Sequence, residues 1–87
     1  MNENLFQNLI FLGIMSSTLK DRGSIVRMKI TPFTNHFGIV EKVSIKLYTS
    51  ENDKEELEFS CMELSRFSWN DLKKYLLPII SLMELSA

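Results

Sequence analysis

The sequence predicts an α+β fold: a small antiparallel sheet of three to four strands, an N-terminal helix, and a capped amphipathic C-terminal helix packed on one face of the sheet. Apolar and polar residues alternate with a period of two in the middle of the chain, and apolar residues recur at three- and four-residue steps at both ends. The 87 residues, 45% of them hydrophobic and 24% charged, have the size and composition of one folded domain. We expect a helical segment over residues 1–19, a sheet over 24–62 and a helix over 68–85.

The N-terminal helix is predicted from Leu5, Leu9 and Leu12, which share one helical face. The run "LIFLGIM" at 9–15 is also long enough for a buried strand, and spacing does not separate the two interpretations. The polar stretch "SSTLKDRGS" at 16–24 predicts a connection.

Three segments predict strands, because every second residue is apolar. The expected inward residues are Val26, Met28, Ile30, Val43, Ile45, Leu47, Leu57, Phe59 and Cys61. The expected outward residues are Arg27, Lys29, Thr31, Lys42, Ser44, Lys46, Tyr48, Glu56, Glu58 and Ser60. Pro32 lacks a backbone donor, so the first strand should end there or lie at a sheet edge. Gly38 should take a positive φ in the turn "TNHFG", and a second turn is expected at "TSENDK".

The segment "FSWNDLKKYLLPIISLM" predicts the C-terminal helix, with Ser68 as its N-cap and Asp71 placed for the capping box. Pro78 should kink or divide it. Its apolar stripe either packs only in the core or also forms a dimer interface. The residues expected in that interface are Leu76, Ile79, Ile80 and Met83.

Charge is segregated along a chain whose net charge is only -1. Residues 20–47 carry six basic and two acidic side chains, whereas residues 51–63 carry one basic and six acidic side chains. A protein that coats nucleic acid by charge alone is therefore excluded, but a local basic surface is not.

The other polar side chains do not form a catalytic or metal-binding motif in the sequence. His36 is expected as an exposed turn residue and Cys61 as a small buried hydrophobe. The spaced carboxylates Glu51, Asp53 and Glu55 lack the glycine that a calcium loop needs. We therefore expect no enzyme activity, no metal and no cofactor.

The single cysteine indicates a reducing intracellular compartment, the cytoplasm or the nucleus. The longest apolar run is far shorter than the roughly 18 to 20 residues that span a bilayer. The segment before it contains Glu3 and no Lys or Arg, unlike a secretory leader. We expect no membrane association.

Residues 24–80 resemble the positive-cofactor-four family of transcriptional coactivators, small homodimers that bind single-stranded DNA. In "SWNDLKKYLLPI" the family's Trp, Leu and Lys stand at Trp69, Leu72 and Lys73. The segment "IVRMKITPF" resembles its first basic strand, and "VSIKLYTSEND" resembles its next strand with an acidic turn after it. The third strand departs, because "EELEFSCMEL" is acidic where the family is basic. The resemblance implies phosphate contacts from Arg27, Lys29, Lys42 and Lys46 and base stacking on Tyr48.

Two functions remain open. The first is a single-stranded nucleic-acid binding module, a homodimeric accessory protein in transcription or replication. It requires that the first strand lie beyond the second, so that Glu56 and Glu58 do not neutralise it. The second is a small adaptor or inhibitor, of a kind also found among virus-encoded proteins, that binds one protein partner through its sheet face or its apolar helix.

Overall fold

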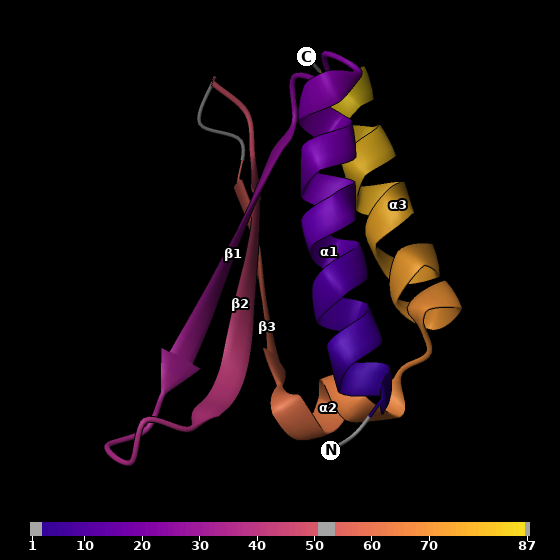
Figure 1. Cartoon of the computed structure of the whole chain (residues 1–87). Coiled ribbons are helices and arrows are strands. Elements are labelled where there is room, and N and C mark those ends of the chain that lie inside the picture. The colour runs from indigo at the N-terminus through magenta and orange to yellow at the C-terminus, as the bar shows by residue number, and fades with distance from the viewer. Residues whose placement is uncertain (1–2, 51–53, 87) are drawn as a thin grey trace.

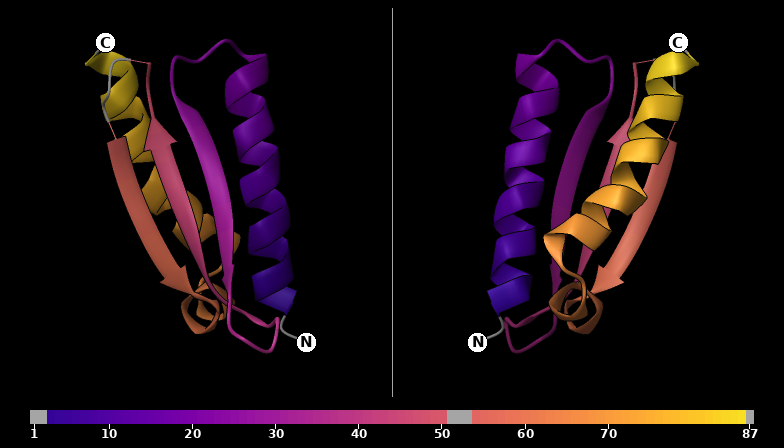
Figure 2. Two further views of the ribbon diagram at one scale, coloured as in Figure 1. Left: turned by 90° about the vertical axis from the view of Figure 1, so that its left-hand side faces the viewer. Right: turned by 90° about the vertical axis from the view of Figure 1, so that its right-hand side faces the viewer.

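The computed structural model describes residues 3–50 and 54–86, and it has the predicted α+β architecture (Figure 1). Its elements are α1 (Glu3–Asp21), β1 (Arg27–Thr34), β2 (Val40–Tyr48), β3 (Lys54–Ser60), α2 (Cys61–Arg66) and α3 (Trp69–Leu85). The three strands form one layer, and α1 and α3 form a second layer on one face of the sheet (Figures 1 and 2).

The strands are antiparallel in the order β1-β2-β3, so β2 is the central strand. Ile45 of β2 lies opposite Ile30 on one side and Leu57 on the other, which places on one face those predicted inward residues that lie within the three strands. Pro32 lies within β1, opposite Val43. Because β1 is an edge strand, a residue without an N–H is tolerated there, as predicted.

The core lies between the inner face of the sheet and the two long helices. Ile45 and Leu47 are fully buried, and Leu12 of α1 and Leu76 of α3 are buried against them in the same cluster. Burying side chains of this size stabilises a fold by about 1.5–3 kcal/mol each. This cluster is therefore the main source of stability.

Residues 9–15 are helical, and α1 continues to Asp21 through most of the stretch that was predicted as a connection. The prediction failed because Leu19, buried like Leu12, extends the inner stripe of the helix by two turns. The helix ends in a Schellman motif: Gly23 has a φ of 73°, and the amide of Ser24 donates to the carbonyl of Leu19 at 3.0 Å.

The third strand ends at Ser60 and not at residue 62, and the short helix α2 follows at once. Ser60 and Glu63 form a capping box, in which each side chain accepts a hydrogen bond at 3.0 Å from the other residue's amide. Cys61 is therefore not an inward strand residue. It is half-buried at the start of α2, and its thiol donates to the carbonyl of Val40 at 3.2 Å.

The C-terminal helix begins where the sequence predicts, with the Ser68 side chain accepting from the amide of Asp71 at 3.2 Å. Pro78 does not divide it, since α3 is one helix from Trp69 to Leu85. Pro78 is exposed, so water can reach the carbonyl of Lys74 that loses its usual donor.

Candidate nucleic-acid interface

The face of the sheet opposite the helices is uncovered in the described part of the chain, and we call it the open face (Figure 2). The alternation that directs apolar side chains inward directs polar ones to this face. Its residues are Arg27, Lys29, Thr31 and Phe33 from β1, Lys42, Ser44, Lys46 and Tyr48 from β2, and Lys54, Glu56, Glu58 and Ser60 from β3. Five are cationic and two are anionic, which gives the open face a net charge of +3.

The strand order separates the two signs of charge. Glu56 and Glu58 lie on one edge strand, and Lys29 lies on the other, with β2 between them. Lys29 is directly opposite Lys46. Two like charges in a cross-strand pair repel each other. The β1 side of the open face is therefore a basic surface without an acidic residue of its own.

The acidic strand neutralises part of β2. The Lys42 ammonium lies 3.4 Å from a Glu58 carboxylate oxygen, and both side chains are about half exposed, at 46% and 52%. Lys46 is opposite Glu56, but residues 3–50 and 54–86 contain no ion pair between the two. An exposed pair such as Lys42–Glu58 contributes at most about 1 kcal/mol, so a phosphate can compete for Lys42.

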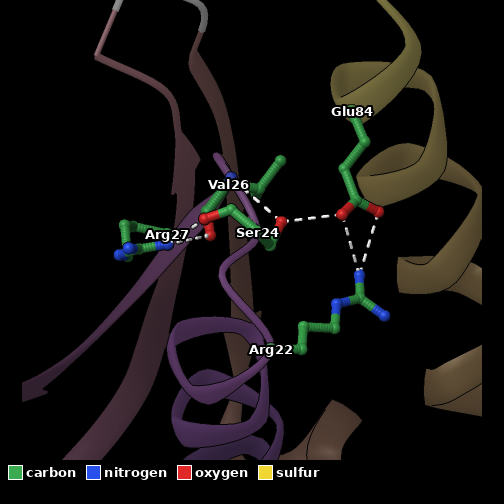
Figure 3. A network of polar contacts seen from close by, with 5 residues as sticks. All are labelled: Arg22, Ser24, Val26, Arg27 and Glu84. Carbon is green, nitrogen blue, oxygen red and sulfur yellow. Dashed lines mark hydrogen bonds and ion pairs between the residues drawn. The ribbon is translucent and has the colours of Figure 1, made fainter.

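The Arg27 side chain is already hydrogen-bonded to backbone groups of its own chain. Its guanidinium donates to the backbone carbonyls of Ser24 and Val26, at the end of a polar network that joins the α1–β1 connection to α3 (Figure 3). In this network Glu84 accepts two hydrogen bonds from Arg22, at 2.9 and 3.0 Å, and one from the Ser24 hydroxyl at 2.7 Å. Arg27 is thus less available to a ligand than Lys29.

Two aromatic side chains share the open face with the lysines. The Tyr48 ring lies 5.8 Å from the Lys46 ammonium, and the Phe33 ring lies 5.0 Å from the Lys42 ammonium. Tyr48 was predicted for this face but Phe33 was not, because Phe33 follows Pro32, where the first strand was expected either to end or to lie at a sheet edge. Alternation continued past Pro32 would have assigned Phe33 to the open face.

The residues predicted for a dimer interface lie in the core of the same chain. Leu76, Ile80 and Met83 are buried, and Ile79 is partly buried against the same cluster. Their stripe faces the sheet and α1, which leaves them almost no surface for a second copy. The exposed apolar residues of α3 are instead Tyr75, Leu77, Leu82 and Leu85.

The remaining candidate residues are dispersed. His36 is exposed in the β1–β2 turn beside Phe37, and Gly38 there has a φ of 79°, as predicted. Glu51 and Asp53, and with them the centre of the second turn, lie outside the described residues. Within the described ranges no three His, Cys, Asp or Glu side chains converge as metal ligands. No helix in these ranges has the length and apolar character to cross a membrane.

No known protein family, curated protein or solved structure matches this chain. The resemblance of residues 24–80 to the positive-cofactor-four family therefore stays a prediction.

Proposed function

We propose that this chain binds single-stranded nucleic acid on the β1–β2 half of its open face. The observation that carries the proposal is the strand order, which keeps Lys29 and Lys46 side by side and separates Lys29 from the glutamates of β3 by the width of β2, with Glu56 opposite Lys46. A phosphate between Lys29 and Lys46 would relieve their repulsion and release counterions.

The rings on the open face support a single strand over a duplex. Unpaired bases stack on aromatic side chains at about 1–3 kcal/mol per base, whatever their sequence. Tyr48 and Phe33 lie towards opposite ends of the sheet, with Lys29 and Lys46 between them in register. A single strand running along β1 could place phosphates on the lysines and a base on each ring.

The test is fluorescence anisotropy of a labelled single strand of about 20 nucleotides, longer than the roughly 4–16 that one small binding domain covers. We expect binding that weakens as salt is raised, with a logarithmic slope of about -0.7 for each phosphate contacted. Lys29→Ala/Lys46→Ala should lower the affinity about tenfold and make the slope less negative by about 1.4, since two contacts are lost.

Lys73→Ala/Lys74→Ala is the matched control. It removes the same charge from α3, which packs on the other face of the sheet. If both double variants lose the same affinity, the binding follows net charge and the open face is not the site. A duplex of the same sequence should bind more weakly than the single strand.

A protein-binding adaptor is the second candidate, and the observation that favours it is the apolar surface of the helical layer. Phe11, Ile14, Trp69 and Leu77 line a groove between α1 and α3. No binding of the oligonucleotide at low salt would reject the open-face proposal and favour this candidate.

A further inference from the structure

The outer side of α1 carries a regular stripe that the fold does not use. Its residues are spaced by alternating steps of three and four, and all six are exposed: Glu3, Phe6, Ile10, Gly13, Ser17 and Lys20. With 3.6 residues per turn they lie within about 100° of one another on the helix. They face away from Leu12 and Leu19, which are buried in the core. We call these six residues the α1 stripe.

Gly13 is the least expected member of this stripe. A glycine inside a helix costs about 0.5–1 kcal/mol relative to alanine. No contact within residues 3–50 and 54–86 requires it, because a Cβ at this position would have no neighbour within 4 Å there, and Gly13 does not have a positive φ. It lies beside Ile10, which is 58% exposed. A helix with a gap next to an exposed apolar side chain is suited to close approach by another helix.

Two copies of the α1 stripe are complementary to each other when the two helices run antiparallel. If a second α1 runs antiparallel and the twofold axis passes between residues 11 and 12, Ile10 meets Gly13 of the partner. The same axis brings Phe6 to Ser17 and Glu3 to Lys20. Each large side chain then faces a small one, and each charge faces its opposite. A parallel pair would instead put Glu3 against Glu3 and Lys20 against Lys20.

The spacing agrees with this arrangement. Steps of three and four are those of the a and d positions of a heptad, with Glu3, Ile10 and Ser17 at one position and Phe6, Gly13 and Lys20 at the other. In the antiparallel pair, each of the three contacts joins a residue at one heptad position to a partner residue at the other position. Such seams pack helices about 20° from antiparallel, 8–10 Å apart.

We propose that two copies of this chain associate through an antiparallel contact between their α1 stripes. Figure 2 shows α1 at one flank of the molecule, with no described element on its outer side. The open face lies on the other side of the sheet, so this contact leaves it free. The proposal does not depend on nucleic-acid binding.

The first test is analytical ultracentrifugation of the full chain and of variants in the stripe. We expect the wild type to form dimers as concentration rises, with a Kd below about 1 mM. Gly13→Leu should raise the Kd at least tenfold although leucine favours a helix, because it fills the gap that receives Ile10. Ile10→Lys should have a similar effect. Circular dichroism checks that each variant is folded.

Leu82→Lys is the matched control, because Leu82 is an apolar residue at least as exposed as Ile10, at 67%, on α3 and not on the stripe. It should leave the dimer Kd unchanged. A wild type that stays monomeric up to about 1 mM would overturn the proposal. So would a dimer that survives Gly13→Leu and Ile10→Lys.

A charge exchange tests the direction of pairing. Glu3→Lys and Lys20→Glu should each raise the Kd about three- to tenfold, and Glu3→Lys/Lys20→Glu should return it to within about twofold of the wild type. Both residues also complement the helix dipole, which makes the exchanged helix less stable than either single variant. Recovery in the double variant therefore reports pairing with the partner. A double variant that dimerises no better than the single ones would contradict the antiparallel arrangement.

Discussion

The two faces of the sheet are made by the same residue alternation but have different consequences. On the inner face Val43, Ile45 and Leu47 are buried under the helices. On the open face Lys42, Lys46 and Tyr48, from the same strand, remain partly or largely accessible. Burial makes the inner face responsible for stability. Ser44 on the open face is also buried, but none of the charged side chains of that face is, so these charges can serve binding without loss of the fold.

This difference shows what alternation alone can predict. A period of two assigns each side chain to a face, but it does not say which strands are neighbours. The sign of the potential near Lys29 depends on that neighbour. With β2 in the centre, Lys29 faces Lys46, whereas an order with β3 beside β1 would have put the acidic strand next to Lys29.

The largest expected difference between the inner face and the open face is that between two consecutive residues of the central strand. Ile45→Ala should lower the free energy of unfolding by about 2–5 kcal/mol, because Ile45 is fully buried between Ile30 and Leu57. Lys46→Ala should change it by no more than about 0.5 kcal/mol. Urea denaturation measures both. Equal effects would mean that the two faces do not differ as described.

A second test concerns the support of the helical layer. Asn8 of α1 is fully buried, and its amide donates to the carbonyls of Leu64 at 2.7 Å and Phe67 at 2.9 Å, at the end of α2. Asn8→Ala leaves both carbonyls without this donor and should cost about 1–3 kcal/mol in urea denaturation. Gln7→Ala, on the exposed side of α1, should cost less than about 0.5 kcal/mol. A similar cost for both variants would mean that the hydrogen bonds of Asn8 do not support the helical layer.

The smallest expected effect concerns the acidic strand of the open face. Glu56→Gln removes a negative charge opposite Lys46 and should raise the affinity for a single-stranded oligonucleotide about twofold at low salt. Glu55→Gln, one residue earlier and on the inner side of the strand, should raise it less. Anisotropy titrations compare the two. A larger gain from Glu55→Gln would place the ligand away from the open face.

Most of the fold could be predicted from the sequence, because alternation and the Ser68 cap are local signals. The failures have physical reasons. The mostly polar segment 16–21 is helical because its one apolar residue, Leu19, is buried in the core. This burial depends on the tertiary structure and cannot be read from the local sequence. Helix α2 was missed although Ser60 and Glu63 have capping-box spacing, since alternation was extended over them.

Apart from Phe33, the residues of the candidate site could be predicted from the sequence, but their arrangement could not. All five of its predicted residues lie on the open face. The hydrogen bonds that hold Arg27 arise from backbone groups of Ser24 and Val26, and no sequence pattern predicts them. The strand order that separates Lys29 from Glu56 is a property of the whole sheet.

The central claim is that the open face of β1 and β2 binds a single strand, and an NMR titration of the ¹⁵N-labelled protein with an oligonucleotide tests it most directly. We expect the largest amide shift changes at Lys29, Thr31 and Lys46, with α1 and α3 little changed. Changes confined to the two long helices, or none at low salt, would contradict the account.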